Sequence, residues 1–491
     1  MHEKVSNENL SRRVIKGGFW VFLLRIVRQL LSFGKLIILA RILSPDDFGL
    51  MGIALLTIAT LGTFSLTGFQ QALIQRKGDI SSYLNATWTF LILRGFILFI
   101  ILFLIAPYVA VFFDAAGAKE IIQVTGFSVL IQPFTNIGII YFQKELEFNK
   151  QFIYQLSGTL VDFIVAVLAV LILKNVWSLV FGLLAGNVTR CFISYLIHSY
   201  RPRLAINFRK VKELFGFGKW VLGASILIFL ITQGDDIFVG KLLGITALGF
   251  YQMAYRISNM PATEITQVIS QVTYPAYSKL QDDIPRLREA YLKVLQLTTF
   301  LSFPIAGSIF ILGPDFTGLL LGRKWLPMVP AMQVLTWWGV VRSMAGVNSS
   351  ILQSVKRPDI ITKLSAIKLP ILAALLYPLS VKWGIIGVSI AVLTSALIIT
   401  PNTFYIVARR ILKSKISIIF KAISVPFLGT IFMVLFLSFF GPSFLSVPGL
   451  VLKITSGFIF YFLITYVIDK ISNQQMWYNI SNLVLTALNK Q

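Results

Sequence analysis

Apolar stretches of about 20 residues recur along the whole chain and are separated by short polar segments. A helix needs about 20 consecutive, mostly apolar residues to cross the hydrocarbon core of a bilayer. The stretches begin near Gly18, Phe48, Thr87, Ile121, Phe152, Val176, Trp220, Ala247, Ala290, Pro327, Ile360, Gly384, Ile416 and Leu450. The pattern predicts an all-α integral membrane protein with about fourteen transmembrane helices.

The composition agrees with a membrane protein. Of the 491 residues, 56% are hydrophobic and 13% are charged, whereas soluble proteins carry about 25% charged residues. A water-soluble fold is therefore excluded. The single cysteine, Cys191, excludes an internal disulfide and a cysteine metal cluster. The first apolar stretch has no small-residue cleavage site, so we expect a retained helix and not a signal peptide.

Basic residues are distributed unevenly between the two ends of the predicted helices. The chain has 44 Lys and Arg against 20 Asp and Glu, a net charge of +24. With fourteen helices and a cytoplasmic N-terminus, 25 basic residues fall on the cytoplasmic side and eight on the other. Basic residues accumulate in cytoplasmic loops because they set membrane topology. Both termini are therefore predicted to be cytoplasmic, and the charge requires no nucleic acid partner.

The sequence repeats itself at a spacing of 200 residues. Gly18, Trp20, Gly34, Ile37, Leu43 and Gly49 recur as Gly218, Trp220, Gly234, Ile237, Leu243 and Gly249. Six-helix units repeated in the same orientation are related by a pseudo-twofold axis along the membrane normal. We therefore predict a lobe at 1–205, a second lobe at 206–412, and two additional helices with a cytoplasmic tail at 413–491. Chance identity in a glycine-rich apolar sequence is the alternative.

Eleven basic residues fall inside the predicted helices, where each costs about 2.5–3.5 kcal/mol on insertion scales. Arg25, Arg28, Ser32 and Lys35 follow one another at intervals of three, four and three residues, which places them on one helix face. This face is a candidate wall for a pyrophosphate or an acidic sugar, because arginine binds such groups through two hydrogen bonds. Neutralisation of acids on other helices, or snorkelling to headgroups, is the alternative. The candidate substrate-binding residues are Arg25, Arg28, Arg94, Arg256 and Arg342.

Four acidic residues also fall inside predicted helices: Asp162, Asp235, Asp236 and Glu264. Lys35 and Asp235 are equivalent in the repeat, so they are a candidate ion pair that opens and closes as a gate. An ordinary interhelical ion pair is the alternative. Asp162 or Glu264 is a candidate site for a coupling proton or sodium ion.

Enzyme motifs are absent from the sequence. It has no Walker A loop and no HExxH motif, and its two histidines, His2 and His198, are far apart in the chain. We therefore predict no catalytic residues, no metal site and no cofactor. A membrane-embedded glycosyltransferase or polymerase would ordinarily place catalytic residues in a sizeable loop. No loop here exceeds about 20 residues by the boundaries that the apolar stretches predict, so this class ranks last.

Three local segments carry a family resemblance. They are residues 39–49 (LARILSPDDFG), 71–77 (QALIQRK) and 274–280 (YPAYSKL). These segments resemble the Wzx-type polysaccharide and O-antigen flippases, in particular the colanic-acid and teichuronic-acid exporter branch. That family is part of the multidrug, oligosaccharidyl-lipid and polysaccharide exporter superfamily, and the resemblance covers essentially the whole chain.

The resemblance implies two six-helix lobes around a central cationic cavity that opens alternately to the two sides. It implies a flippase for undecaprenyl-pyrophosphate-linked oligosaccharide repeat units in the cytoplasmic (inner) membrane, serving surface polysaccharide biosynthesis. The two C-terminal helices would offer a groove for the lipid tail. The expected partners are this glycan and membrane lipids, with a polysaccharide polymerase and its assembly proteins as further candidates.

Two related functions stay open. A lipid II flippase would share the cationic cavity. A cation-coupled drug exporter of the same superfamily would share the fold but would favour an acidic cavity, whereas this chain places more basic than acidic residues in its helices. The sequence leaves the glycan, the coupling ion, the type of cell envelope and the oligomeric state open.

Overall fold

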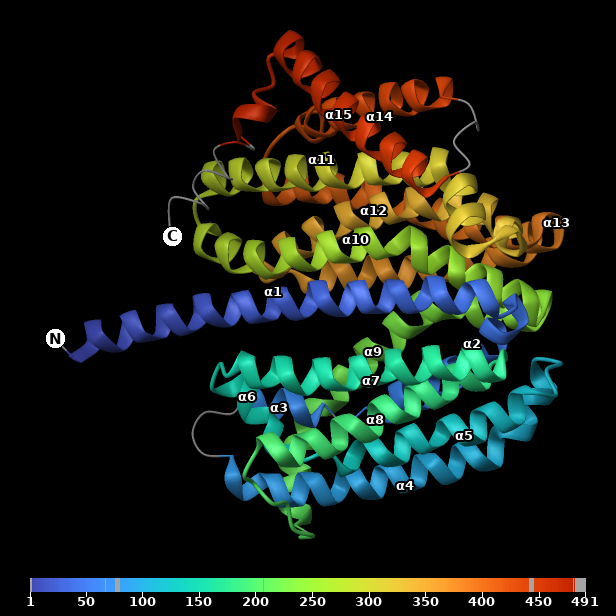
Figure 1. Cartoon of the computed structure of the whole chain (residues 1–491). Coiled ribbons are helices and arrows are strands. Elements are labelled where there is room, and N and C mark those ends of the chain that lie inside the picture. Colours follow the sequence, from blue (N-terminus) through green and yellow to red (C-terminus); the bar gives the residue numbers. More distant parts are fainter. Residues whose placement is uncertain are drawn as a thin grey trace. The chain divides into compact units, whose positions relative to one another are not determined.

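The computed structural model describes residues 2–66, 68–75, 80–205, 207–440, 446–479 and 481. All regular secondary structure in these residues is helical, as predicted (Figure 1). The α-helices are α1 (His2–Ile42), α2 (Pro45–Phe64), α3 (Phe69–Gln75), α4 (Ser81–Phe112), α5 (Ala118–Ile131), α6 (Ile140–Lys144), α7 (Phe148–Leu173), α8 (Trp177–Ile197), α9 (Phe208–Leu243), α10 (Ile245–Leu280), α11 (Ile284–Phe316), α12 (Val329–Ser354), α13 (Pro358–Ile406), α14 (Ser417–Phe439) and α15 (Val447–Ser472). The all-α fold is confirmed.

Each predicted apolar stretch lies on a helix, but the number of membrane spans stays a prediction. Within the described residues, eight helices are long and apolar enough to cross a membrane, or nine if a pair bent by 71° counts as one span. α13 carries two of the predicted stretches, which meet at Gly384, a non-helical residue with φ 57°. α1 is long enough, but its apolar part contains Arg25, Arg28 and Lys35. The chain is a multi-pass membrane protein.

The chain divides into two compact units, residues 1–249 and 250–491. The first unit extends beyond the predicted lobe 1–205 because α9 packs against α2, α3 and α4. The predicted boundaries at 205 and 412 stay predictions.

In the first unit, the tightest helix pair is α7 with α8, and glycines make the approach possible. A Cβ atom at Gly182 would lie 2.6 Å from Ala166 Cβ and 2.8 Å from Asp162 Oδ1, and one at Gly186 would lie 2.7 Å from Gly158 O. Small residues at such positions let two membrane helices pack backbone to backbone. α7 also packs along α1, so it connects α1 to α8.

The segment at the start of α2 carries part of the family resemblance, and its residues have structural roles. Ser44 caps the helix: its hydroxyl accepts from Asp47 N at 3.2 Å, while the Asp47 carboxylate accepts from Ser44 N at 2.9 Å. Pro45 occupies the first turn, where its missing N–H is not needed. The second oxygen of Asp47 accepts from Val176 N at 2.9 Å, at the start of α8. The capping box thus also ties α2 to α8.

The 200-residue repeat has a counterpart in the first unit. Gly49 packs against the backbone of Ile245, and Gly249 packs against the backbone of Pro45, so closely that a Cβ atom at either glycine would overlap its neighbour. The Thr246 hydroxyl donates to Asp46, again 200 residues away. The first turns of α2 and α10 therefore make a reciprocal contact between equivalent positions, which supports the repeat.

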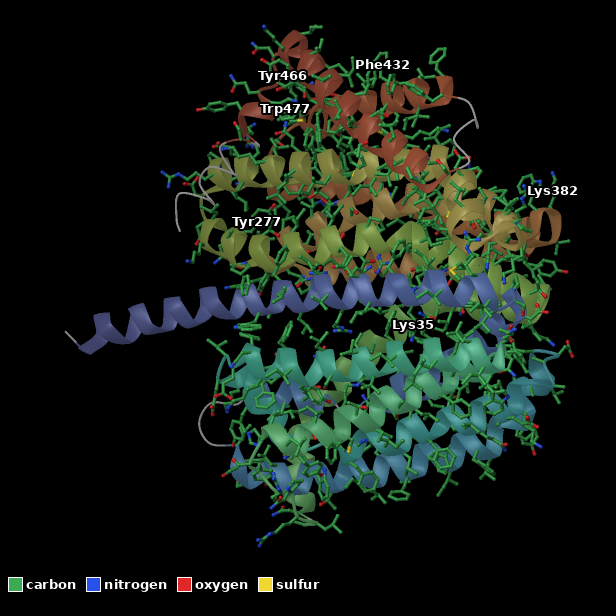
Figure 2. The ribbon with its side chains drawn as sticks, viewed as in Figure 1. Lys35, Tyr277, Lys382, Phe432, Tyr466 and Trp477 are labelled. Atoms are coloured by element: carbon green, nitrogen blue, oxygen red, sulfur yellow. The ribbon has the colours of Figure 1, made fainter. Side chains whose placement is uncertain are left out.

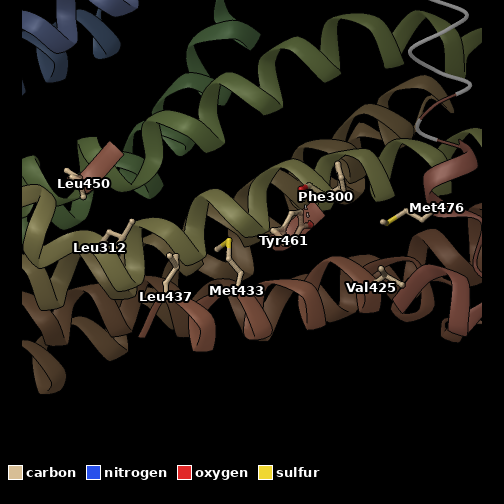
Figure 3. Packing of buried hydrophobic residues seen from close by; sticks show 8 residues of the cluster. All are labelled: Phe300, Leu312, Val425, Met433, Leu437, Leu450, Tyr461 and Met476. Atoms are coloured by element: carbon tan, nitrogen blue, oxygen red, sulfur yellow. Dashed lines mark hydrogen bonds between the residues drawn. The ribbon is translucent and has the colours of Figure 1, made fainter. Parts of the chain in front are cut away.

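In the second unit, α11 packs against α12, α14 and α15, and α12 packs against α13. A cluster of buried side chains joins α11 to α14 and α15 (Figure 3). Tyr461 is fully buried in this cluster, and its hydroxyl donates to Phe300 O at 3.1 Å. Lys453 of α15, 4% exposed, donates to Asp315 of α11 at 3.2 Å. The two C-terminal helices are thus held to α11 by a core and an ion pair.

The outer sides of α14 and α15 present large apolar side chains. Phe432 is 45% exposed and Tyr466 is 55% exposed (Figure 2). Apolar surface of this kind is expected where helices face lipid, because the bilayer core favours it.

Candidate substrate-binding site

The cationic face of α1 lies against α7. Arg28 Nη1 donates to Gln155 Oε1 at 2.7 Å, and Lys35 Nζ donates to both oxygens of Asp162 at 2.8 and 2.7 Å. Both contacts join residues 127 positions apart, so α1 and α7 run parallel with a constant register. Parallel packing agrees with the prediction that these helices are the first and the fifth span. Figure 2 shows Lys35 on α1 at the side of α7.

Lys35 pairs with Asp162 and not with Asp235, its expected partner. The side chains of Lys35 and Asp162 are 20% and 24% exposed. The reason is that α1 packs along α7 over much of its length. Asp235 and Asp236 lie on α9, where Asp235 is buried at 2% exposure and Asp236 is half-buried.

Arg94 of α4 is held by the C-terminal end of α2. Its Nη2 donates to Gly62 O at 3.1 Å and to Ser65 Oγ at 2.7 Å. A cation at this position satisfies free carbonyl groups and favours the negative end of the helix dipole. Arg94 is therefore engaged with α2 in this structure. Arg25, by contrast, is half-buried on α1.

The second unit contains a separate group of cations around Trp338 of α12. The Arg342 guanidinium carbon lies 5.3 Å from the centre of the Trp338 ring, and Lys368 Nζ of α13 lies 5.8 Å from it. Tyr255 of α10 packs on the same indole at 5.3 Å and its hydroxyl accepts from Arg342 Nη1 at 3.3 Å. We call Tyr255, Trp338, Arg342 and Lys368 the Trp338 cluster. Two positive charges thus share one aromatic ring, on helices that the sequence predicts to span the membrane.

The other two candidates of the second unit lie on α10. Arg256 follows Tyr255 in the chain and is exposed, and Glu264 is half-buried two turns later. Lys368 is one of the eleven basic residues inside the predicted helices but is not among the predicted site residues, and neither is Trp338. A signal was present, because Trp338 lies four residues before Arg342 and therefore on the same helix face.

His198, outside the membrane-spanning helices, has an altered pKa. Burial lowers the pKa of His198, at the end of α8, and the positive charge of Lys150 lowers it further. The ring stacks on Tyr141 at 5.9 Å, and Nδ1 accepts from Tyr200 N at 3.0 Å. This hydrogen bond requires the neutral imidazole, since a protonated ring has no acceptor.

Comparison with known proteins now gives the family. Residues 38–330 match the polysaccharide biosynthesis protein family. The chain belongs to this family. It is 25% identical over 457 residues to the lipopolysaccharide biosynthesis protein WzxC of Escherichia coli K12, covering 92% of this chain and 89% of that one. It is also 25% identical over 295 residues to the teichuronic acid biosynthesis protein TuaB of Bacillus subtilis, covering 60% and 61%. The resemblance found in the local segments is confirmed.

Among solved structures, the polysaccharide biosynthesis chain resembles the lipid II flippase MurJ in an inward closed conformation. The TM-score is 0.75 at 15% identity, and the match covers 94% of this chain and 100% of that one. At this identity the likeness establishes the fold alone. The chain therefore shares the fold of MurJ.

Proposed function

We propose that this protein moves undecaprenyl-pyrophosphate-linked oligosaccharide repeat units across the cytoplasmic membrane by alternating access, for surface polysaccharide biosynthesis. Its family and its flippase-like fold support a lipid-linked glycan as the transported class. The two groups of intramembrane cations support a phosphate-bearing substrate. The function is transport without catalysis.

The observation that carries the proposal is the surroundings of Arg342. Its partners in this structure are neutral: the Tyr255 hydroxyl and the face of the Trp338 indole. A guanidinium in a membrane helix is costly unless it is paired, hydrogen-bonded or turned to a water-filled space. Lys368 adds a second cation at the same ring. A pyrophosphate supplies the negative charge that the Arg342 guanidinium favours.

The cationic face of α1 is the second proposed contact with the substrate. Arg25 and Arg28 offer guanidinium groups, and the Lys35–Asp162 pair is the proposed place where a coupling proton or sodium ion acts. A proton on Asp162, or a sodium ion displacing Lys35, would weaken this pair. We further propose an inner-membrane location with both termini in the cytoplasm, based on the uneven distribution of basic residues.

The test is translocation of a radiolabelled undecaprenyl-pyrophosphate oligosaccharide between the leaflets of proteoliposomes. Wild-type protein should accelerate it, and Arg342→Gln should lower the rate about tenfold to a hundredfold. This range corresponds to the 1.5–3 kcal/mol of a hydrogen bond to a charged group. Arg286→Gln is the matched control, because Arg286 is an exposed cation that pairs with Asp283 at the start of α11.

Three results would contradict the proposal, the last of them for the Trp338 cluster alone. Export of cationic dyes without movement of lipid-linked glycan would identify a drug exporter. Faster movement of lipid II than of the oligosaccharide lipid would identify a cell-wall precursor flippase. Equal rates for Arg342→Gln and Arg286→Gln would remove the Trp338 cluster from the substrate path.

A further inference from the structure

A cavity of about 270 Å³ lies in the first unit, at the break between two helical segments, Ala118–Phe134 and Ile137–Lys144. The two halves of this broken helix meet at 71°. Asn136 fixes the break: its backbone N–H donates to Ser194 Oγ at 2.9 Å, and its side chain donates to Tyr200 O at 2.6 Å. Broken helices in membrane proteins occur where irregular backbone lines a cavity. The remaining walls come from α3, α4, α6 and α7.

The lining of this cavity is polar but uncharged. None of the described residues that line it is an Asp, Glu, Lys, Arg or His. Its polar groups are mostly side-chain amides, from Gln70, Gln132, Gln143, Gln151, Gln155 and Asn136. Aromatic rings add apolar faces, from Trp88, Phe142 and Tyr154. The cavity thus differs in kind from the cationic groups described above.

Three buried polar atoms of the lining lack a hydrogen-bond partner within the described part of the chain. They are Thr87 Oγ1, Trp88 Nε1 and Gln151 Oε1. The Thr87 side chain is 1% exposed. Leaving a buried donor or acceptor unsatisfied costs about 1–3 kcal/mol. Three residues with such atoms lie around one cavity.

A fourth group has a defined orientation. Arg28 has only donors, so the Gln155 oxygen must face it, as the 2.7 Å contact records. The Gln155 NH₂ group is then the part left for the cavity, which its side chain also lines. The residues that line the cavity therefore carry the indole N–H and an amide NH₂ as donors, an amide oxygen as acceptor, and a hydroxyl that does both.

This set of groups selects the chemistry of the ligand. A sugar hydroxyl donates and accepts at once, and a sugar ring carries several of them, so one ring can donate to amide oxygens and accept from N–H groups of the lining residues. A carboxylate or phosphate only accepts, and none of the described residues that line the cavity is a cation that would offset its loss of hydration. An apolar group would leave all the polar atoms unsatisfied. The aromatic rings suit the apolar C–H faces of a sugar ring.

We propose that this cavity binds an uncharged sugar ring of the transported glycan, and that neutral rings are preferred there to acidic ones. The inference rests on the proposed function for the source of the sugar. The volume lies just below the range of about 300–1,000 Å³ typical of ligand pockets, which suits one ring and not a whole repeat unit. Gln155 joins this sugar site to Arg28 of the cationic face.

The test uses purified full-length protein in detergent and the soluble repeat-unit oligosaccharide released from the host's own lipid-linked precursor. Saturation-transfer NMR identifies which sugar ring receives magnetisation from the protein. We expect the strongest transfer to a neutral ring, and at least tenfold weaker binding of that ring in Gln151→Leu. Gln123→Leu is the matched control, because Gln123 of α5 lies outside the cavity and bonds to Phe103 O.

A structural role for Gln151 would be visible separately. Its oxygen has no partner in the described residues, so removal of the amide should leave the melting temperature unchanged or raised. A lower melting temperature together with unchanged sugar binding would overturn the proposal. Transfer mainly to an acidic ring, or no transfer because the cavity holds water only, would also overturn it. The assay involves no transport, so it can fail while translocation in proteoliposomes succeeds, and the reverse.

Discussion

The two groups of intramembrane cations are balanced in different ways. In the first unit, Lys35 of α1 forms an ion pair with Asp162 of α7, and the Nζ and Oδ2 atoms are 2.7 Å apart. In the second unit, Arg342 contacts neutral groups: it packs on the Trp338 ring and donates a hydrogen bond to the Tyr255 hydroxyl. The first arrangement neutralises a charge within the protein. The second holds a charge in position and leaves it positive.

This difference predicts that the first group contributes mainly to stability and the second mainly to substrate binding. A neutralised pair contributes to the packing of two helices, and loss of one member leaves an isolated charge. A cation held by an aromatic ring keeps its capacity to attract an anion, because the ring brings no negative charge of its own. Mutations in the first group should therefore change stability more, and mutations in the Trp338 cluster should change transport more.

The largest effect on stability is expected for Asp162→Asn. The change leaves the Lys35 ammonium without its carboxylate and should lower the free energy of unfolding by about 1–3 kcal/mol. Thermal unfolding in detergent micelles would measure it. The exchange Lys35→Asp with Asp162→Lys should restore much of the loss. Asp359→Asn is the control, because Asp359 forms an exposed pair with Arg357. If Asp162→Asn were as stable as this control, the Lys35–Asp162 pair would not be a source of stability.

A smaller effect is expected for Trp338→Phe. The ring is kept, but phenylalanine attracts cations more weakly than tryptophan, so Arg342 and Lys368 should each lose part of their interaction, about 0.5–1 kcal/mol. The transport rate should fall by a few-fold at subsaturating substrate, while the melting temperature changes little. A large drop in melting temperature with unchanged transport would mean that Trp338 serves packing and not the cations.

The smallest effect on stability is expected from a fall in pH, which protonates His198 and so adds a positive charge to the first unit. The pKa of His198 is lowered by burial and by Lys150, so the unfolded chain takes up this proton more readily than the folded one. Stability from the neutral ring is present above about pH 6.5 and is lost as the pH falls through the lower folded value. The melting temperature should therefore decline less in His198→Gln than in wild type between pH 7.5 and 5. Parallel declines would assign the pH response to other groups.

Much of the fold could be predicted from the sequence, because a membrane helix needs a long run of apolar residues and such runs are visible in the sequence. Every predicted stretch lies on a helix, including the two that meet at Gly384 inside α13. The division of the chain was harder to foresee. It depends on which helices α9 contacts, and the packing of α9 on α2, α3 and α4 leaves no periodic signal in the sequence.

The candidate site could be predicted in part. The spacing of Arg28 and Lys35 placed them on one face, and both contact α7. The partner of Lys35 could not be derived, because the register between α1 and α7 is a tertiary property. The cavity proposed to bind a sugar could not be predicted from the sequence for a related reason. Its glutamines are distributed over four segments of the chain, and only the break near Asn136 brings them together.

The contact between Gly49 and Gly249 has a further consequence. Each glycine admits the backbone of the other's helix start, Ile245 in one direction and Pro45 in the other. This is the isologous contact of a twofold dimer, made here within a single polypeptide. A side chain at either position would push the same two helix starts apart. The contact therefore places one steric requirement on two positions 200 residues apart, as a twofold interface places it on two copies of one chain.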